Sequence, residues 1–287
     1  MAIEGRCAAR AALAGNPSDG FGGAVLATVV PSLEAVVTVQ PGARTPISEL
    51  PLLDATRRAL DRHGYATVED GAIQLRTTIP RSVGLAGSSA IIIAAIRALV
   101  VPGALPPPLE LARLALEIEV DGLGIAAGPQ DRIVQAEGRS VLMDFGTADW
   151  IVTPIDPPAP LDLFIAWTTT PPTPSHAVHG PLHARSTDPT VRRVMARLSE
   201  LAHAGGTALR AGDVDGLRRA MERSLEQRAE VIELEPGHLA LVEGARALGA
   251  AVNYTGSGGA IVGHSTDLDA VGSWAADAGY GFRRLTL

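Results

Sequence analysis

The sequence predicts an α+β protein built from two domains. Strand-like runs alternate with helical runs in both halves of the 287-residue chain. A proline-rich stretch at residues 154–160 separates the halves, so we expect one domain over residues 1–153 and a second over 154–287. A turn rich in glycine and serine at residues 80–90 joins a strand-like run to a helical run, and it is the most informative segment for function.

The first half is expected to contain both strands and helices. We expect strands at residues 5–13, 24–40, 68–79 and 140–145. Helices are expected at residues 49–63, 91–101 and 109–121, with a short one after Asp131. Their apolar residues recur at helical spacing, as Leu111, Leu114 and Ile118 do in the third.

The second half alternates in the same way. After a strand at residues 161–167 and a long polar segment at 168–188, we expect helices at 190–211, 213–232 and 237–249. Strands then flank a glycine turn within residues 251–263, and a helix at 266–279 leads to a last strand at 280–287.

Composition excludes several classes of partner. A net charge of −7 and only 3% aromatic residues argue against nucleic acid as the main partner. Cys7 is the single cysteine, so no disulfide forms within the chain and a reducing compartment is expected. Neither a signal-peptide pattern nor an apolar run long enough to span a membrane is present, so we expect a cytoplasmic protein without a membrane partner.

The chain contains no lysine, and all 24 of its basic residues are arginines. A Walker-type P-loop, a pyridoxal-phosphate Schiff base and the protein-kinase active site each need a lysine, so all three are excluded. Any phosphoryl chemistry here must rely on backbone N–H groups, Mg²⁺ and arginine.

The segment Pro80-Arg-Ser-Val-Gly-Leu-Ala-Gly-Ser-Ser-Ala90 has the character of a phosphate-binding loop. A glycine-rich turn that opens into a helix places unpaired backbone N–H groups at the positive end of the helix dipole. The serine hydroxyls at the helix start can reach a phosphate oxygen or its Mg²⁺. The segment alone is equally compatible with an ordinary helix capped by Ser88 or Ser89.

Two carboxylates form the second candidate constellation. Phosphoryl transfer needs a metal ligand and a carboxylate that orients or deprotonates the attacking hydroxyl. Glu119 ends a helix and Asp131 follows a glycine loop, while Glu117 points to another helix face. Taken alone, these residues are more typical of a solvated helix end and a helix cap.

Two other polar glycine loops are candidates for ligand contact. Asn16 and Asp19 lie in the turn at residues 15–23, where they can bind hydroxyl groups of a sugar or polyol, or simply form an Asx turn. The loop at residues 256–259 lets backbone approach a ligand closely, or is a plain turn.

Two further chemistries find little support. His176, His179 and His183 lie in a proline-rich segment without a His-Glu-x-x-His motif, which favours surface or substrate-contacting histidines over zinc. The serine-hydrolase motif Gly-x-Ser-x-Gly is incomplete, because Ile91 stands at its last position.

Taken together, the three glycine motifs resemble those of the GHMP kinase superfamily, whose members include galactokinase, homoserine kinase and mevalonate kinase. The loop at residues 80–90 follows the family's second motif with one additional residue, and residues 15–23 and 254–260 stand where its first and third motifs lie. Asp131 follows Glu119 by 12 positions, similar to the family's metal-binding glutamate and catalytic aspartate. The resemblance implies an N-terminal ATP-binding domain and a C-terminal ferredoxin-like domain.

Within the superfamily the chain is most similar to the glucuronokinases, at residues 15–19, 83–91, 124–132 and 254–259. This resemblance implies ATP-dependent phosphorylation of the anomeric hydroxyl of D-glucuronate, giving glucuronate 1-phosphate. Ala177 and Ala24 stand where basic residues are common in the family. A missing carboxylate partner would point to another sugar, or to an arginine such as Arg132, Arg185 or Arg192 as its replacement.

The resemblance also assigns roles to individual residues. Asp131 receives or orients the attacking hydroxyl and Arg132 neutralises charge or pairs with Asp131, while Ser89 and Glu119 hold Mg²⁺, with Glu117 as the alternative metal ligand. The residues that contact ATP are Pro80, Gly84, Leu85, Ala86, Gly87, Ser88, Ser89 and Ala90. The residues that contact the acceptor are Asn16, Ser18, Asp19, Gln130, Gly256, Ser257 and Gly258.

Other acceptors remain open at this stage. A kinase of this fold for galactose, galacturonate or a non-sugar alcohol such as homoserine or mevalonate would keep the ATP loop and change the acceptor contacts. A non-catalytic protein of the same fold would be expected to lose Ser89, Glu119 or Asp131, and all three are present. Either a monomer or a homodimer is compatible with the sequence.

Overall fold

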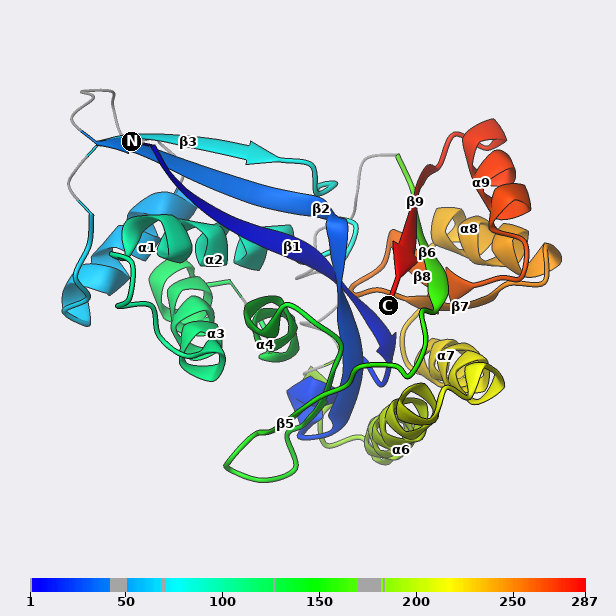
Figure 1. Cartoon of the computed structure of the whole chain (residues 1–287). Coiled ribbons are helices and arrows are strands. Elements are labelled where there is room, and N and C mark those ends of the chain that lie inside the picture. Colours follow the sequence, from blue (N-terminus) through cyan, green and yellow to red (C-terminus); the bar gives the residue numbers. More distant parts are fainter. Residues whose placement is uncertain (1, 42–50, 69–70, 126, 170–181, 183) are drawn as a thin grey trace. The chain divides into compact units, whose positions relative to one another are not determined.

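The chain folds into two compact units in a computed structural model, which describes residues 2–41, 51–68, 71–125, 127–169, 182 and 184–287 (Figure 1). The first unit contains residues 1–9, 29–80 and 86–138, and the second contains residues 10–28, 81–85 and 139–287. Strands β1 (Ile3–Ala14) and β2 (Ala24–Pro41) each begin in one unit and end in the other. The expected boundary at residues 153 and 154 lies inside the second unit.

The first unit combines a small sheet with a group of helices. Within it, β2 pairs with the antiparallel strand β3 (Gly71–Thr77), Ala35 lying opposite Thr77 and Pro41 opposite Gly71. The helices of this unit are α1 (Pro51–Arg62), α2 (Gly87–Leu99), α3 (Pro108–Glu117), a π-helical turn η2 (Ile118–Gly122) and α4 (Gln130–Glu137).

Helix α2 is the core of the first unit. Its isoleucines Ile92, Ile93 and Ile96 are fully buried, as expected for a helix that is apolar all round. Helices α1 and α3 both pack on it (Figure 1). It also lies directly against β1, because a Cβ at Gly5 would come within 2.0 Å of the Ala94 carbonyl oxygen. The middle of α2 therefore packs directly on the backbone of β1.

The second unit contains a four-stranded antiparallel sheet in the order β7-β8-β6-β9. Its strands are β6 (Asp162–Trp167), β7 (Ala251–Tyr254), β8 (Ala260–His264) and β9 (Gly281–Thr286). Helices follow β6 and β8, so the chain order is the ferredoxin-like βαββαβ pattern. Phe164, Val252 and Ile261 are fully buried between this sheet and its helices.

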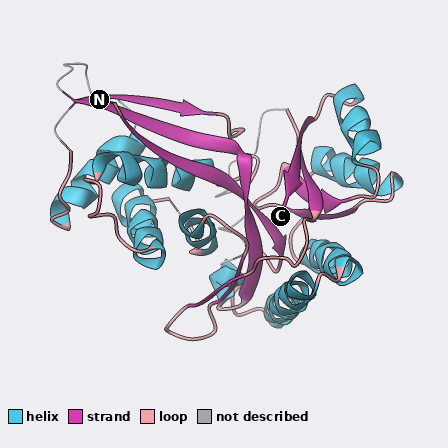
Figure 2. Cartoon of the chain, viewed as in Figure 1, coloured by secondary structure: helices cyan, strands magenta, loops and turns pink. Residues whose placement is uncertain are grey.

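The helices of the second unit are α6 (Pro189–Ala211), α7 (Val214–Ala229), α8 (Pro236–Ala247) and α9 (Leu268–Asp277) (Figure 2). Helices α6 and α7 pack against each other along their length, and α7 also packs on β7. In the same unit β4 (Val141–Asp144) pairs with the start of β2 and with β5 (Ile151–Pro154), and η1 (Ser18–Phe21) follows β1.

The expected elements are present within a few residues of their predicted bounds, which confirms the predicted α+β class. Two features were not predicted. Strand β5 is short and largely exposed, so no apolar alternation marks it. The end of the helix expected at 109–121 is the π-helical turn η2, which places Glu119 in the buried interior.

Cys7 lies in β1 with 2% of its surface exposed, and burial raises the pKa of its thiol to about 12. It is therefore a small buried residue of this strand. Among the helices that the structure describes, none has the length and apolarity needed to cross a membrane.

Candidate active site

The start of α2 forms the first part of the site. Ala86 precedes the helix in the left-handed conformation, with φ of 57°. The N–H groups of the first turn have no carbonyl partners within the helix and point out of its N-terminus. This turn can therefore hold an anion such as a phosphate.

The two serines of this turn have different partners. The Ser88 hydroxyl donates a hydrogen bond of 2.6 Å to Glu119. Ser89 is fully buried, and its hydroxyl bonds Gln135 Oε1 at 2.6 Å and the Ala86 carbonyl at 3.2 Å. Gln135 in turn donates to the carbonyls of Ala8 and Ala86. In this structure Ser88 reaches the carboxylate, while Ser89 anchors the loop.

Glu119 and Arg132 form a buried ion pair beside Ser88. Glu119 is fully buried, and Arg132 donates to its Oε2 through both Nε and Nη2. Arg132 also donates to the Gly128 carbonyl at 2.6 Å. The pair satisfies charges that would be costly to bury separately.

Asp131 lies next to this pair and is more accessible. Its side chain is 17% exposed, and its Oδ2 lies 3.6 Å from Arg132 Nη1. The neighbouring Gln130 is mostly buried. Glu117, the alternative metal ligand, pairs instead with Arg62 and His63 at the surface, and these partners help to lower its pKa against the effect of its partial burial.

In the second unit, the loop at residues 81–85 meets the glycine loop after β7. A Cβ at Gly84 would lie 2.9 Å from the Ser257 nitrogen, and a Cβ at Gly256 would lie 2.5 Å from the Gly84 carbonyl oxygen. Thr255 Oγ1 donates to that oxygen at 2.9 Å. Two of the predicted motifs therefore touch through their backbones, which is possible only without side chains.

The first motif is also held in the second unit. Asn16 is buried; its amide donates to the Tyr254 carbonyl at 3.3 Å, and its oxygen accepts from Asn253 at 3.2 Å. The Ser18 hydroxyl donates to the Ala24 carbonyl at 2.7 Å. Asp19 is 8% exposed. In the structure Asn16 and Ser18 thus shape the turn itself, and their contact with an acceptor stays a prediction.

Comparison with known proteins agrees with this arrangement. Residues 52–139 match the family model described as the GHMP kinases N terminal domain. The chain is 30% identical to "Probable glucuronokinase 2" of Arabidopsis thaliana, with 91% of this chain and 83% of the relative aligned. It is 31% identical to "Glucuronokinase 1" of the same plant, over 91% of this chain and 84% of the relative.

The chain belongs to the GHMP kinase family. The resemblance noted in the sequence is thereby confirmed, and this GHMP kinase is an ATP-dependent enzyme. Its fold also matches that of the Streptococcus pneumoniae phosphomevalonate kinase, with a TM-score of 0.81 and 14% identity over 100% of both chains.

Oxygen atoms of the kind that Mg²⁺ prefers lie at the start of α2. Within the described ranges, no group of three or more histidine, cysteine, aspartate or glutamate side chains is placed to hold a metal on its own. Mg²⁺ in a kinase needs only one or two carboxylates besides phosphate oxygens and water. Glu119 and the Ser88 hydroxyl supply oxygen donors of the right kind next to the start of α2.

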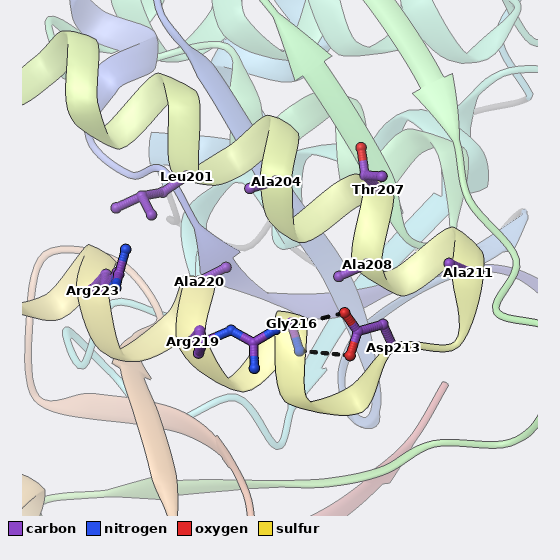
Figure 3. A pocket seen from close by; sticks show the side chains of 10 residues that line it. All are labelled: Leu201, Ala204, Thr207, Ala208, Ala211, Asp213, Gly216, Arg219, Ala220 and Arg223. Carbon is purple, nitrogen blue, oxygen red and sulfur yellow. Dashed lines mark hydrogen bonds and ion pairs between the residues drawn. The ribbon is translucent and has the colours of Figure 1, made fainter.

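A groove of about 490 Å³ lies elsewhere in the second unit, between α6 and α7 (Figure 3). Small residues such as Ala204, Ala208 and Gly216 line it, and Asp213 caps α7 at its edge. None of the predicted site residues contributes to this groove. His176, His179, His183 and Ala177 lie outside the described residues.

Sequence reasoning missed three polar residues that hold the motifs. Gln135 bonds Ser89, buried Arg10 bonds the carbonyls of Gly84 and Thr255, and Arg228 bonds the Gly256 carbonyl at 2.6 Å. Arg228 could have been found, since it continues the buried stripe of α7 at the spacing of Leu217, Met221 and Ser224. No local sequence pattern distinguishes Arg10 or Gln135 from other residues of their elements.

Replacing Gly84 by alanine tests the contact between the two loops, with Gly64→Ala as the matched control. Both glycines have positive φ, 75° and 68°, but a Cβ at Gly64 meets nothing within 4 Å. Gly64→Ala should therefore cost only the backbone strain of about 1–2 kcal/mol. Gly84→Ala should also displace the loop and lower kcat/KM for ATP by about 10²-fold.

Thermal denaturation and steady-state kinetics measure the two effects. Equal losses of stability and unchanged kinetics in both variants would mean that the close approach at Gly84 does not affect activity.

Proposed function

We propose that this kinase transfers the γ-phosphoryl group of ATP to the anomeric hydroxyl of a sugar, D-glucuronate, giving glucuronate 1-phosphate and ADP. The similarity to two glucuronokinases over most of the chain supports this choice of acceptor. The observation that carries the catalytic assignment is the buried cluster of Ser88, Glu119 and Arg132 at the start of α2, with Asp131 at its accessible side.

In the proposed reaction the anomeric oxygen attacks the γ-phosphorus while the bond to the β–γ bridging oxygen breaks. Asp131 orients the attacking hydroxyl and accepts its proton. Arg132 keeps Asp131 in place and neutralises charge nearby, since its Nη1 faces Oδ2 at 3.6 Å. Asn16 and Asp19 of the first motif contact other hydroxyls of the acceptor.

ATP is proposed to bind through its phosphates at the start of α2, where backbone N–H groups and the helix dipole favour negative charge. Glu119, with Ser88 or Ser89, would hold Mg²⁺. The ion supplies neutralisation of the phosphate charge when bound. Because the chain lacks lysine, the remaining positive charge must come from arginine.

A substrate panel tests the acceptor. Coupled ADP release with Mg·ATP should be fastest with D-glucuronate among D-glucuronate, D-galacturonate, D-galactose, D-glucose, L-homoserine and mevalonate. The product should carry phosphate at the anomeric position, which ³¹P NMR identifies. Turnover confined to a neutral sugar or to a non-sugar alcohol would refute glucuronate as the substrate.

Asp131→Asn tests the proposed base. The amide is nearly isosteric but cannot accept the proton, so kcat should fall about 10²–10⁴-fold, with little change in the KM for ATP. Asp121→Asn, at an exposed aspartate of the π-helical turn η2, serves as the control. Near-normal turnover of Asp131→Asn would remove this residue from the mechanism.

Glu119→Gln and Glu117→Gln distinguish the two candidate metal ligands. Glu119→Gln should lower kcat about 10²-fold or more and raise the Mg²⁺ concentration needed for half-maximal rate, because it removes a buried carboxylate beside Ser88. Glu117→Gln removes a surface pair and should leave both values nearly unchanged. Magnesium titration of the rate is the measurement, and the reverse pattern would reassign the ligand.

A further inference from the structure

A small cavity in the second unit lies beside the third glycine motif. Its volume is about 30 Å³, room for one or two water-sized groups but not for a sugar ring. Arg228, His238, Tyr254, Ser257 and Gly258 line it, together with residues 232–235. Its wall thus joins the end of α7, the start of α8 and the loop after β7.

Arg228 is a buried cation without a carboxylate partner among the described residues. Its side chain is 1% exposed, and burial lowers its pKa to about 10. Nη1 donates to the Gly256 carbonyl, while no described residue bonds Nε or Nη2. Arg132 binds Glu119 through the same two atoms of its own guanidinium group, Nε and Nη2. This guanidinium edge matches a carboxylate with two parallel donors.

Tyr254 adds a second unpartnered polar group to the same cavity. Its ring packs near the Arg228 guanidinium, 5.2 Å from centroid to Cζ, and beside the His238 ring. Its hydroxyl is buried and bonds no described residue, and burial raises its pKa to about 12. A neutral phenol of this kind donates a hydrogen bond. Buried polar groups are nearly always paired, so two such groups together indicate a missing acceptor.

The other charged groups around the cavity do not offset its positive charge. Glu233 and Glu235 are exposed, and Glu235 lies 3.8 Å from His238. Burial lowers the pKa of His238, so its ring is mainly neutral near pH 7. Arg10 contributes a further positive field, since its charge opposes protonation of Arg228. The buried wall is therefore cationic.

The cavity is directly linked to the first motif. The Tyr254 carbonyl accepts from the Asn16 side chain, and Ser224, one helical turn before Arg228 on α7, accepts from the Gly15 nitrogen. The buried face of α7 and Tyr254 therefore connect the cationic cavity with the turn at residues 15–23, which is proposed to contact the acceptor.

We propose that Arg228 and Tyr254 bind the carboxylate of the acceptor substrate and so select an acid over the corresponding neutral sugar. This rests on the proposed function, in which the acceptor is a sugar acid. Arg228 donates through Nε and Nη2 and Tyr254 through its hydroxyl. The single guanidinium edge and the small volume favour a carboxylate over a phosphate group.

Tyr254→Phe is the sharper test, because the hydroxyl has no partner among the described residues to lose. The variant should fold with unchanged or higher thermal stability. By isothermal titration calorimetry it should bind D-glucuronate about 10-fold more weakly and bind AMPPNP as the wild type does. Tyr280→Phe, at a partly buried tyrosine of the second unit, is the control and should bind both ligands normally.

Arg228→Met should weaken D-glucuronate binding about 100-fold or more and reduce the preference for D-glucuronate over D-glucose, which has a hydroxymethyl group in place of the carboxylate. Arg228→Lys should recover part of that loss. Arg219→Met, on the exposed side of the same helix, is the control.

Two outcomes would overturn the proposal. A loss of AMPPNP affinity with normal glucuronate binding would assign Arg228 and Tyr254 to phosphate. Unchanged affinities for both ligands would leave Arg228 only the role of holding the Gly256 loop.

The proposed function can fail separately. If the wild type binds D-galacturonate, L-homoserine or mevalonate instead, and Tyr254→Phe weakens that binding, the carboxylate site stands and the assigned substrate is wrong. If D-glucuronate is phosphorylated and every variant binds it equally well, the proposed function is supported and the proposed carboxylate site is refuted. Failure of the wild type to bind any of these acids would refute both.

Discussion

The buried ion pair between Glu119 and Arg132 is the interaction on which the candidate active site in the first unit depends. It fixes the π-helical turn η2 to the start of α4, and through Ser88 it reaches the first turn of α2. Removing one partner of such a pair costs about 3–5 kcal/mol, because the other charge is left buried. The pair therefore explains why the start of α2, the Glu119 carboxylate and Asp131 lie together in that unit.

In the second unit, helix α7 has a comparable role through polar groups on two of its faces, with Ser224 and Arg228 on the buried face and the half-buried Glu222 on another. Ser224 accepts from Gly15, Glu222 accepts from the Val252 nitrogen at 2.6 Å, and Arg228 donates to Gly256. One helix therefore bonds to the first motif, to β7 and to the third motif. Polar groups at core positions are costly unless they are satisfied, and Ser224 and Arg228 bond to backbone groups of the glycine loops. The exception is the Nε–Nη2 edge of Arg228, which carries the proposed carboxylate site.

Sequence periodicity predicted nearly all helices and strands because their apolar faces are long and regular. The loop ahead of α2 was also evident, since two glycines and two serines before an apolar helix form a local pattern. The partners within the site could not be found in this way. Ser88 and Glu119 are 31 positions apart, and Thr255 and Gly84 are 171 positions apart. Such pairs depend on how distant elements pack, which no local pattern records.

The sequence by itself therefore determined the α+β class, the order of the three glycine motifs, the absence of lysine chemistry and membership of a kinase family. Only the tertiary structure decided that Ser88 rather than Ser89 meets Glu119, that Glu119 is buried while Glu117 pairs at the surface, and that Arg228 is a core residue. The physical reason is burial. Charge interactions and hydrogen bonds become strong when packing removes water from around them. Packing is a property of the whole fold.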